Sequence, residues 1–238
     1  MHQQFKIYWK LYEECFSNEE LLENFCNLMD VYHSSGKADI IDIGCGQSQY
    51  LIDFYKNTNY NLYAIDNEPI QIDALKRRIE KIKSNSSIKF SINEFPTKEF
   101  SEIKFTGVIV SNLLHFMDLK ESYDFIKKIE KQTSKGSLIL FKTHSWRHNS
   151  NGDFSYFKHY FRKKDFYKLL PKNKYEYLYF EQKSATKNER EIWFVKKWIE
   201  AWLNFNNVFD KDKISKAQEN HLKNIENTEN MTVVVKRK

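Results

Sequence analysis

Two carboxylates and two glycines carry the strongest chemical signal in the sequence. Asp42 closes a short apolar run just before Gly44 and Gly46, and Asp66 closes a second apolar run 22 residues after Gly44. This spacing corresponds to one β-turn-α-β unit. A glycine loop lets the backbone approach a ligand, a helix N-terminus favours an anionic group, and a carboxylate accepts hydrogen bonds from ribose hydroxyls. The pattern predicts a site for a cofactor that contains a nucleoside.

The elements that must position these residues are short apolar strands separated by amphipathic helices. Strands are expected at 40–43, 61–65, 88–92, 105–110 and 137–143. This alternation is typical of a parallel sheet that is covered on both faces by helices. Ligands bind such sheets at the carboxyl ends of the strands. Asp42, Asp66, Ser111 and Thr143 all fall at these ends.

Capping patterns set the expected ends of several helices. Ser17 with Glu20 predicts a capping box within the helical region 5–34, and Asp118 with Glu121 predicts one that begins a helix ended by Gly136. Pro69 is expected in the first turn of another helix.

The part of the chain after Thr143 is less regular. Residues 144–160 are rich in histidine and aromatic residues without clear periodicity, and they predict a lid loop with Trp146 among its closing contacts. A short helix at 162–170 and a strand at 175–180 follow. Residues 186–206 favour a helix that begins at a capping box of Thr186 and Glu189, although 190–197 alone would also suit a strand. A polar helix within 210–230 and a last strand at 232–235, paired with the sixth, complete the expected order.

Composition bounds the class of protein. The chain has 238 residues, 41% of them hydrophobic, and no apolar run near the roughly 20 residues of a membrane helix. The N-terminus carries no signal-peptide pattern, so we expect a soluble cytoplasmic protein with no membrane partner. The three cysteines suggest free thiols rather than disulfides or zinc ligands. The net charge of +6 is mild, and it indicates a lysine-rich surface unless the charge clusters on one face.

The motif Asp42-Ile43-Gly44-Cys45-Gly46 resembles the first motif of class I S-adenosylmethionine-dependent methyltransferases. Asp66 resembles the acid that holds the adenosine ribose in that family, and residues 110–115 resemble the segment after strand four in its small-molecule members. The resemblance implies an α/β, Rossmann-like fold with a mainly parallel seven-stranded sheet and helices on both faces. Three features depart from the family pattern: Ser48 replaces the third glycine, Thr106 replaces the acid that usually begins strand four, and the acid often found after strand three is represented only by Asn93 or Glu94.

The expected organisation follows from this resemblance. Residues 1–36 form an N-terminal helical cap, residues 37–183 form the methyltransferase-like core with its lid loop 144–160, and residues 184–238 form C-terminal helices and a terminal strand. S-adenosyl-L-methionine is the implied cofactor. The residues expected to bind it are Asp42, Gly44, Cys45, Gly46, Asp66, Asn67, Asn93, Glu94, Ser111 and Asn112.

Methyl transfer from a sulfonium is an in-line displacement, so a general base is needed only if the acceptor arrives protonated. His144 and His115 are the candidates because each follows a strand end. His144, His148 and His159 do not match a metal-ligand pattern in a loop, so no metal site is expected.

The predicted function is methyl transfer to a small-molecule acceptor at oxygen, nitrogen or sulfur. An RNA methyltransferase is an alternative supported by the positive charge, and a non-catalytic cofactor-binding or interaction module is another supported by the motif departures. A nicotinamide dehydrogenase is disfavoured because Gln47, Ser48 and Gln49 follow Gly46, which breaks the GxGxxG spacing. No Asn-Pro-Pro-aromatic tetrapeptide follows strand four, which disfavours methylation of DNA base amino groups.

Overall fold

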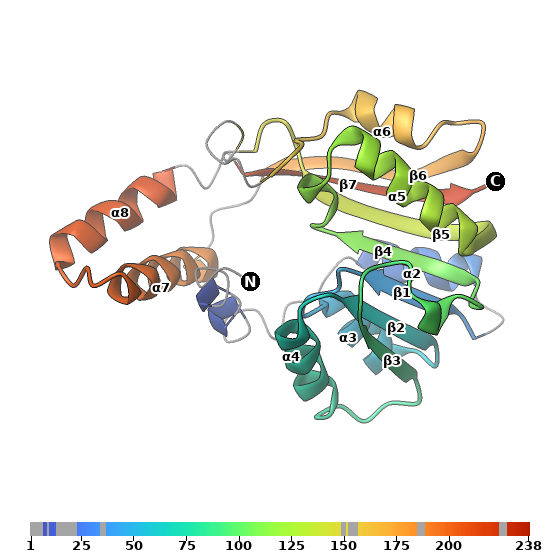
Figure 1. Ribbon diagram of the computed structural model, residues 1–238, viewed down its shortest axis with the longest axis horizontal. Helices are drawn as coiled ribbons and strands as arrows, with labels where there is room; N and C mark the ends of the chain where they lie inside the picture. The colour runs from blue at the N-terminus through green and yellow to red at the C-terminus, as the bar shows by residue number, and fades with distance from the viewer. Residues whose placement is uncertain are drawn as a thin grey trace.

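A computed structural model describes residues 7–8, 10–12, 23–33, 37–148, 151, 157–184, 189–223 and 228–238. Its centre is a seven-stranded sheet in the order β3-β2-β1-β4-β5-β7-β6 (Figure 1). The strands are β1 (Asp39–Ile43), β2 (Asn61–Asp66), β3 (Ser87–Ile92), β4 (Phe105–Ser111), β5 (Thr133–His144), β6 (Tyr175–Ser184) and β7 (Glu229–Arg237).

The predicted mainly parallel sheet is confirmed. The first five strands pair in parallel, and β7 lies antiparallel between β5 and β6. Parallel neighbours direct their carboxyl ends to one edge, so the ends of β2, β1 and β4 lie side by side there. Asp66, Asp42 and Asn112 sit at or next to these ends.

Helices cover both faces of the sheet. Helices α2 (Glu23–Tyr32), α3 (Gln49–Asn57) and α4 (Pro69–Ile79) pack on one face, and α5 (Leu119–Lys131) and α6 (Lys163–Leu169) pack on the other. The middle strands β1 and β4 carry buried apolar residues on both sides because each side meets a helical layer. Ile40 and Ile109 face the first layer, whereas Ile41 and Val108 face the second.

The capping box predicted for α5 is present. The Asp118 side chain accepts from the Glu121 backbone N–H at 2.7 Å, and the Glu121 side chain accepts from the Asp118 backbone N–H at 2.8 Å. The prediction that Gly136 ends this helix is wrong, because α5 ends at Lys131 and Gly136 lies within β5. Its φ of +88° falls where the pairing of β4 and β5 shifts register, a backbone irregularity that suits glycine.

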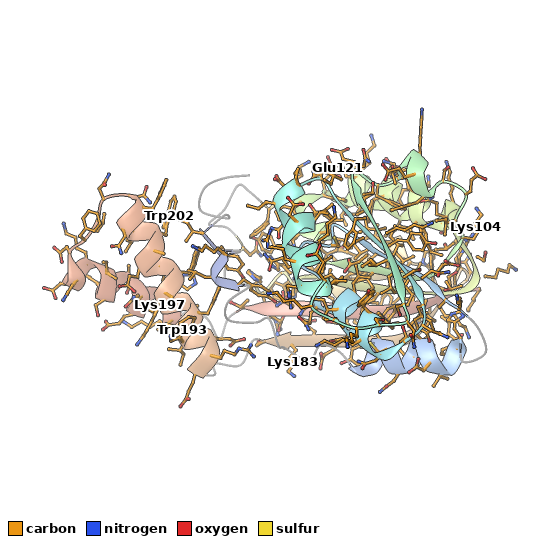
Figure 2. The ribbon with its side chains drawn as sticks, turned by 90° about the horizontal axis from the view of Figure 1, so that it is seen from below. Lys104, Glu121, Lys183, Trp193, Lys197 and Trp202 are labelled. Atoms are coloured by element: carbon orange, nitrogen blue, oxygen red, sulfur yellow. The ribbon has the colours of Figure 1, made fainter. Side chains whose placement is uncertain are left out.

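Two helices project beyond the sheet. Residues 189–205 form a helix, α7 (Glu189–Phe205), rather than a strand, and α8 (Lys211–Lys223) turns back beside it (Figure 1). The helical residues 7–8 and 10–12 pack on this hairpin, with the rings of Tyr8 and Phe194 edge-to-face at 5.0 Å. Figure 2 shows Trp193, Lys197 and Trp202 on the hairpin, well separated from Lys104 on the body of the protein. The capping pairs expected at Ser17 and Thr186 involve residues outside the described ranges.

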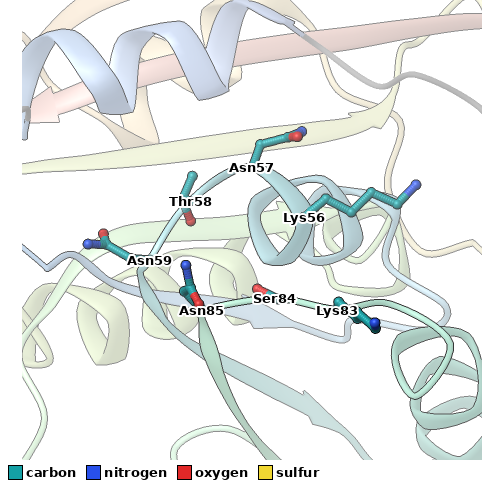
Figure 3. Close-up of a pocket in the computed structure, with 7 residues that line it drawn as sticks. All are labelled: Lys56, Asn57, Thr58, Asn59, Lys83, Ser84 and Asn85. Carbon is teal, nitrogen blue, oxygen red and sulfur yellow. The ribbon is translucent and has the colours of Figure 1, made fainter.

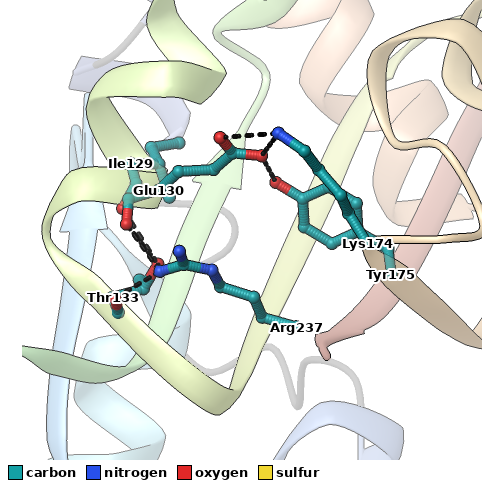
Figure 4. Close-up of polar contacts among 6 residues, drawn as sticks. All are labelled: Ile129, Glu130, Thr133, Lys174, Tyr175 and Arg237. Carbon is teal, nitrogen blue, oxygen red and sulfur yellow. Dashed lines mark hydrogen bonds and ion pairs between the residues drawn. The ribbon is translucent and has the colours of Figure 1, made fainter.

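The last strand is anchored at the amino edge of the sheet. Arg237 Nη1 donates to the carbonyl oxygens of Glu130 and Thr133, and the Glu130 carboxylate accepts from the Lys174 ammonium and from the Tyr175 hydroxyl (Figure 4). Strand β7 completes the sheet from the far end of the sequence, and this network ties its terminus to α5 and β6.

Thr106, which replaces the usual acid, joins β4 to β1. Its hydroxyl accepts from the backbone N–H of Asp39 at 3.0 Å and donates to the Asp39 carbonyl at 3.1 Å. Among the described residues, no helix is long and apolar enough to cross a membrane.

Candidate functional site

The glycine loop after β1 is held against the end of β2. The backbone N–H groups of Gly44 and Cys45 donate to the Ile65 carbonyl at 2.8 and 3.0 Å, and the Gly46 N–H donates to Asp66 Oδ2 at 2.8 Å. Gly44 and Gly46 have φ of +66° and +50°, which L-residues rarely adopt. A Cβ on Gly46 would meet nothing within 4 Å, so the loop leaves open space at this point.

Ser48 performs a role that explains why the third glycine is dispensable. Its φ is −27°, so no left-handed conformation is required at this position. The Ser48 hydroxyl caps α3 by accepting from the Leu51 N–H at 3.1 Å, and it donates to Asp42 Oδ2 at 2.5 Å. The side chain therefore fixes both the helix N-terminus and the neighbouring carboxylate.

Asp42 is a buried carboxylate with an unused acceptor. Only 2% of the residue is exposed, and Oδ1 has no hydrogen-bond partner among the described residues. Burial raises the pKa of Asp42 to about 7, the hydrogen bond from Ser48 opposes this rise, and the nearby charge of Asp66 adds to it. A buried carboxylate is costly unless a donor pairs with it, so this atom fits a cationic or N–H group of a ligand.

Asp66 lies at the end of β2 and links the loop to the next helix. Its Oδ2 accepts from Gly46 and its Oδ1 accepts from the Glu68 N–H at 2.9 Å. Burial raises the pKa of Asp66, and the backbone hydrogen bonds from Glu68 and Gly46 lower it in part. Each carboxylate oxygen keeps a second lone pair, which suits hydroxyl groups of a ribose. Asn67 is exposed directly beside it.

The remaining predicted cofactor residues lie at the ends of β3 and β4. Asn93 and Glu94 are exposed after β3, and Asn93 Nδ2 donates to Ser91 Oγ at 3.0 Å. Ser111 ends β4, and Asn112 follows it with φ of +55° while its N–H donates to the Lys142 carbonyl at 2.8 Å. These residues share the edge that carries Asp42 and Asp66.

The sequence interpretation missed Tyr50. This residue lies in the first turn of α3 and is 4% exposed. Burial raises its pKa well above the ordinary value, the charge of Asp42 adds to the rise, and a contact with the Ser111 side chain opposes it. Tyr50 thus places a protonated phenol between the glycine loop and the end of β4. Its position just after the glycine motif was the available signal.

Both candidate bases belong to a stack of three histidines. The ring centroids of His115 and His144 are 3.8 Å apart, and those of His144 and His148 are also 3.8 Å apart, with interplanar angles of 11° and 13°. Phe157 packs edge-on against His115 and His144. Burial lowers the pKa of all three histidines, to about 3 for His115 and about 4 for His148, so the stack is neutral at pH 7.

The stack is not arranged to bind a metal. Ring nitrogens of parallel, face-to-face imidazoles point sideways and do not converge on one point. In the described part of the chain, no group of three or more His, Cys, Asp or Glu side chains is placed to hold a metal ion.

The ends of the predicted lid loop are tied together. The Trp146 N–H donates to the Phe161 carbonyl at 2.9 Å, and the Phe161 N–H donates to the His144 carbonyl at 3.1 Å. Residues 149–150 and 152–156 of this loop are outside the described ranges, so the lid stays a prediction that concerns the segment between these fixed ends.

A polar cavity of about 570 Å³ lies at the opposite edge of the sheet (Figure 3). It is lined by the end of α3 and the segment before β3, including Lys56, Thr58 and Lys83. It is separated from the carboxylates and the glycine loop by the length of the strands, so it is not a candidate for the cofactor site.

A glycine loop after β1, an acid at the end of β2 and the strand order 3-2-1-4-5-7-6 define a Rossmann-like methyltransferase fold. The profile of the family described as "Methyltransferase domain" matches residues 34–230, and the chain belongs to this family. The predicted class I methyltransferase family is confirmed, and S-adenosylmethionine is the methyl donor that this membership supports. No curated protein sequence matches the chain.

Solved structures support the same fold. An S-adenosylmethionine-dependent methyltransferase from Thiobacillus denitrificans, in complex with S-adenosyl-L-homocysteine, matches with a TM-score of 0.68 and 13% identity over 100% of this chain and 99% of that one. YjhP from E. coli matches with a TM-score of 0.66 and 12% identity over 96% and 100%. A Geobacter sulfurreducens methyltransferase with S-adenosyl-L-homocysteine matches with a TM-score of 0.63 and 10% identity over 96% and 98%.

Proposed function

We propose that the protein transfers a methyl group from S-adenosylmethionine to a small-molecule acceptor. The observation that carries this proposal is the buried, unpartnered Oδ1 of Asp42 beside a glycine loop that is bonded to Asp66. A ligand with an ammonium group at one end and a ribose at the other satisfies both carboxylates. A nicotinamide dinucleotide would instead bring a pyrophosphate close to the buried Asp42 carboxylate.

The residues of the site have distinct roles in this proposal. S-adenosylmethionine, when bound, supplies a methyl group activated by its sulfonium. Asp42 accepts from the ammonium group, Asp66 accepts from the ribose hydroxyls, and the backbone at Gly46 admits the ligand closely because no side chain fills that space. Asn93 and Glu94 follow the neighbouring strand, where the adenine would lie, and Ser111 and Asn112 lie next to the methionine end.

Alignment supplies most of the rate in such a reaction, since correct placement of the two reactants is worth about 7–11 kcal/mol. The rigid loop, bonded to Ile65 and Asp66, holds the donor, and the acceptor binds over the ends of β4 and β5. His144 and His115 are neutral, which is the form that accepts a proton. Their lowered pKa values make them weak bases, so they suit orientation of an acceptor that needs little deprotonation.

Titration calorimetry with S-adenosylhomocysteine and NADH tests the proposal. We expect micromolar or tighter binding of the former and none of the latter. Asp66→Ala should weaken binding by about 1.5–3 kcal/mol, the usual contribution of a hydrogen bond to a charged group. Asp73→Ala, an exposed acid on α4, is the matched control and should leave the affinity unchanged. Binding of NADH, or equal affinities of the wild type and Asp66→Ala, would refute the assignment.

The acceptor is tested separately, by transfer of a labelled methyl group to candidate phenols, amines and thiols. Labelled product with a small acceptor, lost in Asp42→Asn, supports the proposal. Binding of the cofactor without transfer to any acceptor, including RNA, would favour a non-catalytic module.

A further inference from the structure

Two arginine side chains lie over the indole ring of Trp146, just beyond the end of β5. The guanidinium carbons of Arg147 and Arg162 are each 5.0 Å from the centroid of the indole ring. The indole remains 39% exposed, and both arginines are exposed. A guanidinium packed on an indole gains a cation–π attraction while its N–H groups remain available for hydrogen bonds.

Neither guanidinium has a carboxylate partner within the described part of the chain. The ion pairs nearby use other residues: Lys158 pairs with Glu121, and His159 lies 3.3 Å from Asp165. The Asp165 carboxylate accepts from the Arg162 backbone N–H at 2.8 Å and is not paired with the Arg162 guanidinium. Two arginines that are oriented by one aromatic ring and have no carboxylate partner among the described residues are suited to an anion from outside the protein.

The surrounding sequence concentrates the positive charge of the protein. Residues 142–168 contain seven Lys and Arg against two Asp, which accounts for most of the net charge of +6. Lys163 and Lys164 are exposed beside Arg162, at the start of α6. The chain therefore carries a local excess of charge rather than an even lysine-rich surface.

This group is close to the proposed acceptor site. Trp146 lies two residues after His144, whose ring stacks on His115 in the short 3-10 helix that follows β4. The hydrogen bonds of Phe161 with Trp146 and His144 hold the two chain segments that carry Arg147 and Arg162 side by side. An anion bound between these arginines would belong to a ligand that reaches the ends of β4 and β5.

We propose that Trp146, Arg147 and Arg162 form a phosphate-binding clamp for the methyl acceptor, which rests on the proposed methyltransferase function. A phosphate monoester carries a charge of about −1.5 to −2 and presents three oxygens, which matches two guanidinium forks. The exposed part of the indole offers apolar contact to the group attached to that phosphate. The phosphate belongs to a small phosphate ester or to the backbone of RNA.

Fluorine NMR of protein labelled with 5-fluorotryptophan tests the clamp without requiring turnover. The chain has five tryptophans, so Trp146 is assigned from the resonance that disappears in Trp146→Phe. The probes are phenyl phosphate, phenyl acetate as a neutral control, and a single-stranded RNA oligomer, each titrated in the presence of S-adenosylhomocysteine. The variants are Arg147→Gln and Arg162→Gln, with Arg162→Lys to keep the charge but remove the fork.

Lys104→Gln is the matched control. Lys104 is exposed just before β4 (Figure 2), whereas Trp146 follows β5 at the opposite edge of the sheet. Replacing Lys104 removes the same single charge. The Arg162→Gln change leaves the backbone cap on α6 intact, because that bond uses the main-chain N–H.

We expect phenyl phosphate to shift the Trp146 resonance, and each Gln variant to weaken binding about tenfold or more, with Arg162→Lys close to Arg162→Gln and Lys104→Gln unchanged. If RNA is the source, it should compete with phenyl phosphate, and each Gln variant should reduce the log–log salt slope by about 0.7. The clamp is wrong if neither phosphate probe shifts Trp146, or if Lys104→Gln weakens binding as much as Arg162→Gln. Since S-adenosylhomocysteine binding is measured independently, such a result would leave the proposed methyltransferase function standing.

Discussion

Replacing Asp42 by asparagine should stabilise the ligand-free protein at pH 8 and weaken cofactor binding. The carboxylate is buried, receives one hydrogen bond from Ser48 and lies near the charge of Asp66. Asparagine has the same shape and keeps an acceptor for the Ser48 hydroxyl, but it carries no charge to bury. The variant therefore separates the cost of the carboxylate in the free protein from its contribution to ligand binding.

The expected magnitude follows from the pKa of Asp42, which rises from 3.8 to about 7 on folding. At about 1.4 kcal/mol per unit, ionised Asp42 costs the folded state about 4 kcal/mol above pH 7. The folded state binds the proton more tightly than the unfolded state, so this cost is absent below pH 4, grows between pH 4 and pH 7, and is complete above pH 7. In the variant, the buried amide N–H group has no acceptor, which destabilises the folded state by about 1–3 kcal/mol and offsets part of the gain from removing this charge. The net gain for Asp42→Asn at pH 8 is about 1–3 kcal/mol.

Urea unfolding of both proteins at pH 5, 6, 7 and 8 measures this difference. The gain should be largest at pH 8 and should vanish or change sign at pH 5, where wild-type Asp42 is protonated. Asp73→Asn, an exposed acid on α4, should show no such dependence. Calorimetry at pH 8 should show S-adenosylhomocysteine binding weakened by about 1.5–3 kcal/mol in Asp42→Asn. If the stability difference between Asp42→Asn and the wild type is the same at all four pH values, Asp42 is not a strained carboxylate and the reasoning fails.

Three further predictions concern the loop, the histidine stack and the last strand. Gly46→Ala should cost about 1–2 kcal/mol of stability because of the positive φ at this position, and it should also weaken S-adenosylhomocysteine binding. Gly44→Ala should be more destabilising, because its Cβ would in addition lie 3.1 Å from the Leu113 side chain. Urea unfolding and calorimetry distinguish the two variants, and equal stability of the two would contradict the geometry. Folding lowers the pKa of His148 to about 4 and so favours its neutral form, and the wild type should therefore lose stability as pH falls from 6.5 to 4. His148→Phe should reduce this loss. Melting temperatures that show the same pH dependence in both proteins would exclude a contribution of His148. Arg237→Ala removes donors to two carbonyl oxygens and should destabilise by about 2–3 kcal/mol in urea without changing cofactor affinity, and a loss of affinity would place β7 closer to the site than the structure does.

The sequence alone determined the class of fold and the edge of the sheet at which the glycine loop, Asp42 and Asp66 lie. Local periodicity distinguishes apolar strands from amphipathic helices, and the ends of strands in a parallel sheet share one edge, so this placement needed no coordinates. The Asp118 capping box was equally local, since its two hydrogen bonds join residues three positions apart. Helix α7 was favoured over a strand because its apolar period persists for several turns.

Other features were decided by tertiary structure because they depend on residues that are distant in sequence. The Gly136 prediction failed because a glycine that ends a helix and one at an irregular strand pairing have the same local sequence signal. The raised pKa of Asp42 depends on how completely the strands and α3 bury it. Stacking of His115 on His144 requires β4 and β5 to be neighbours, and Trp146 meets Arg162 only because residues 145 and 161 pair across a loop. Periodicity reports which side of an element is buried, whereas the partner that buries it is chosen by packing over the whole chain.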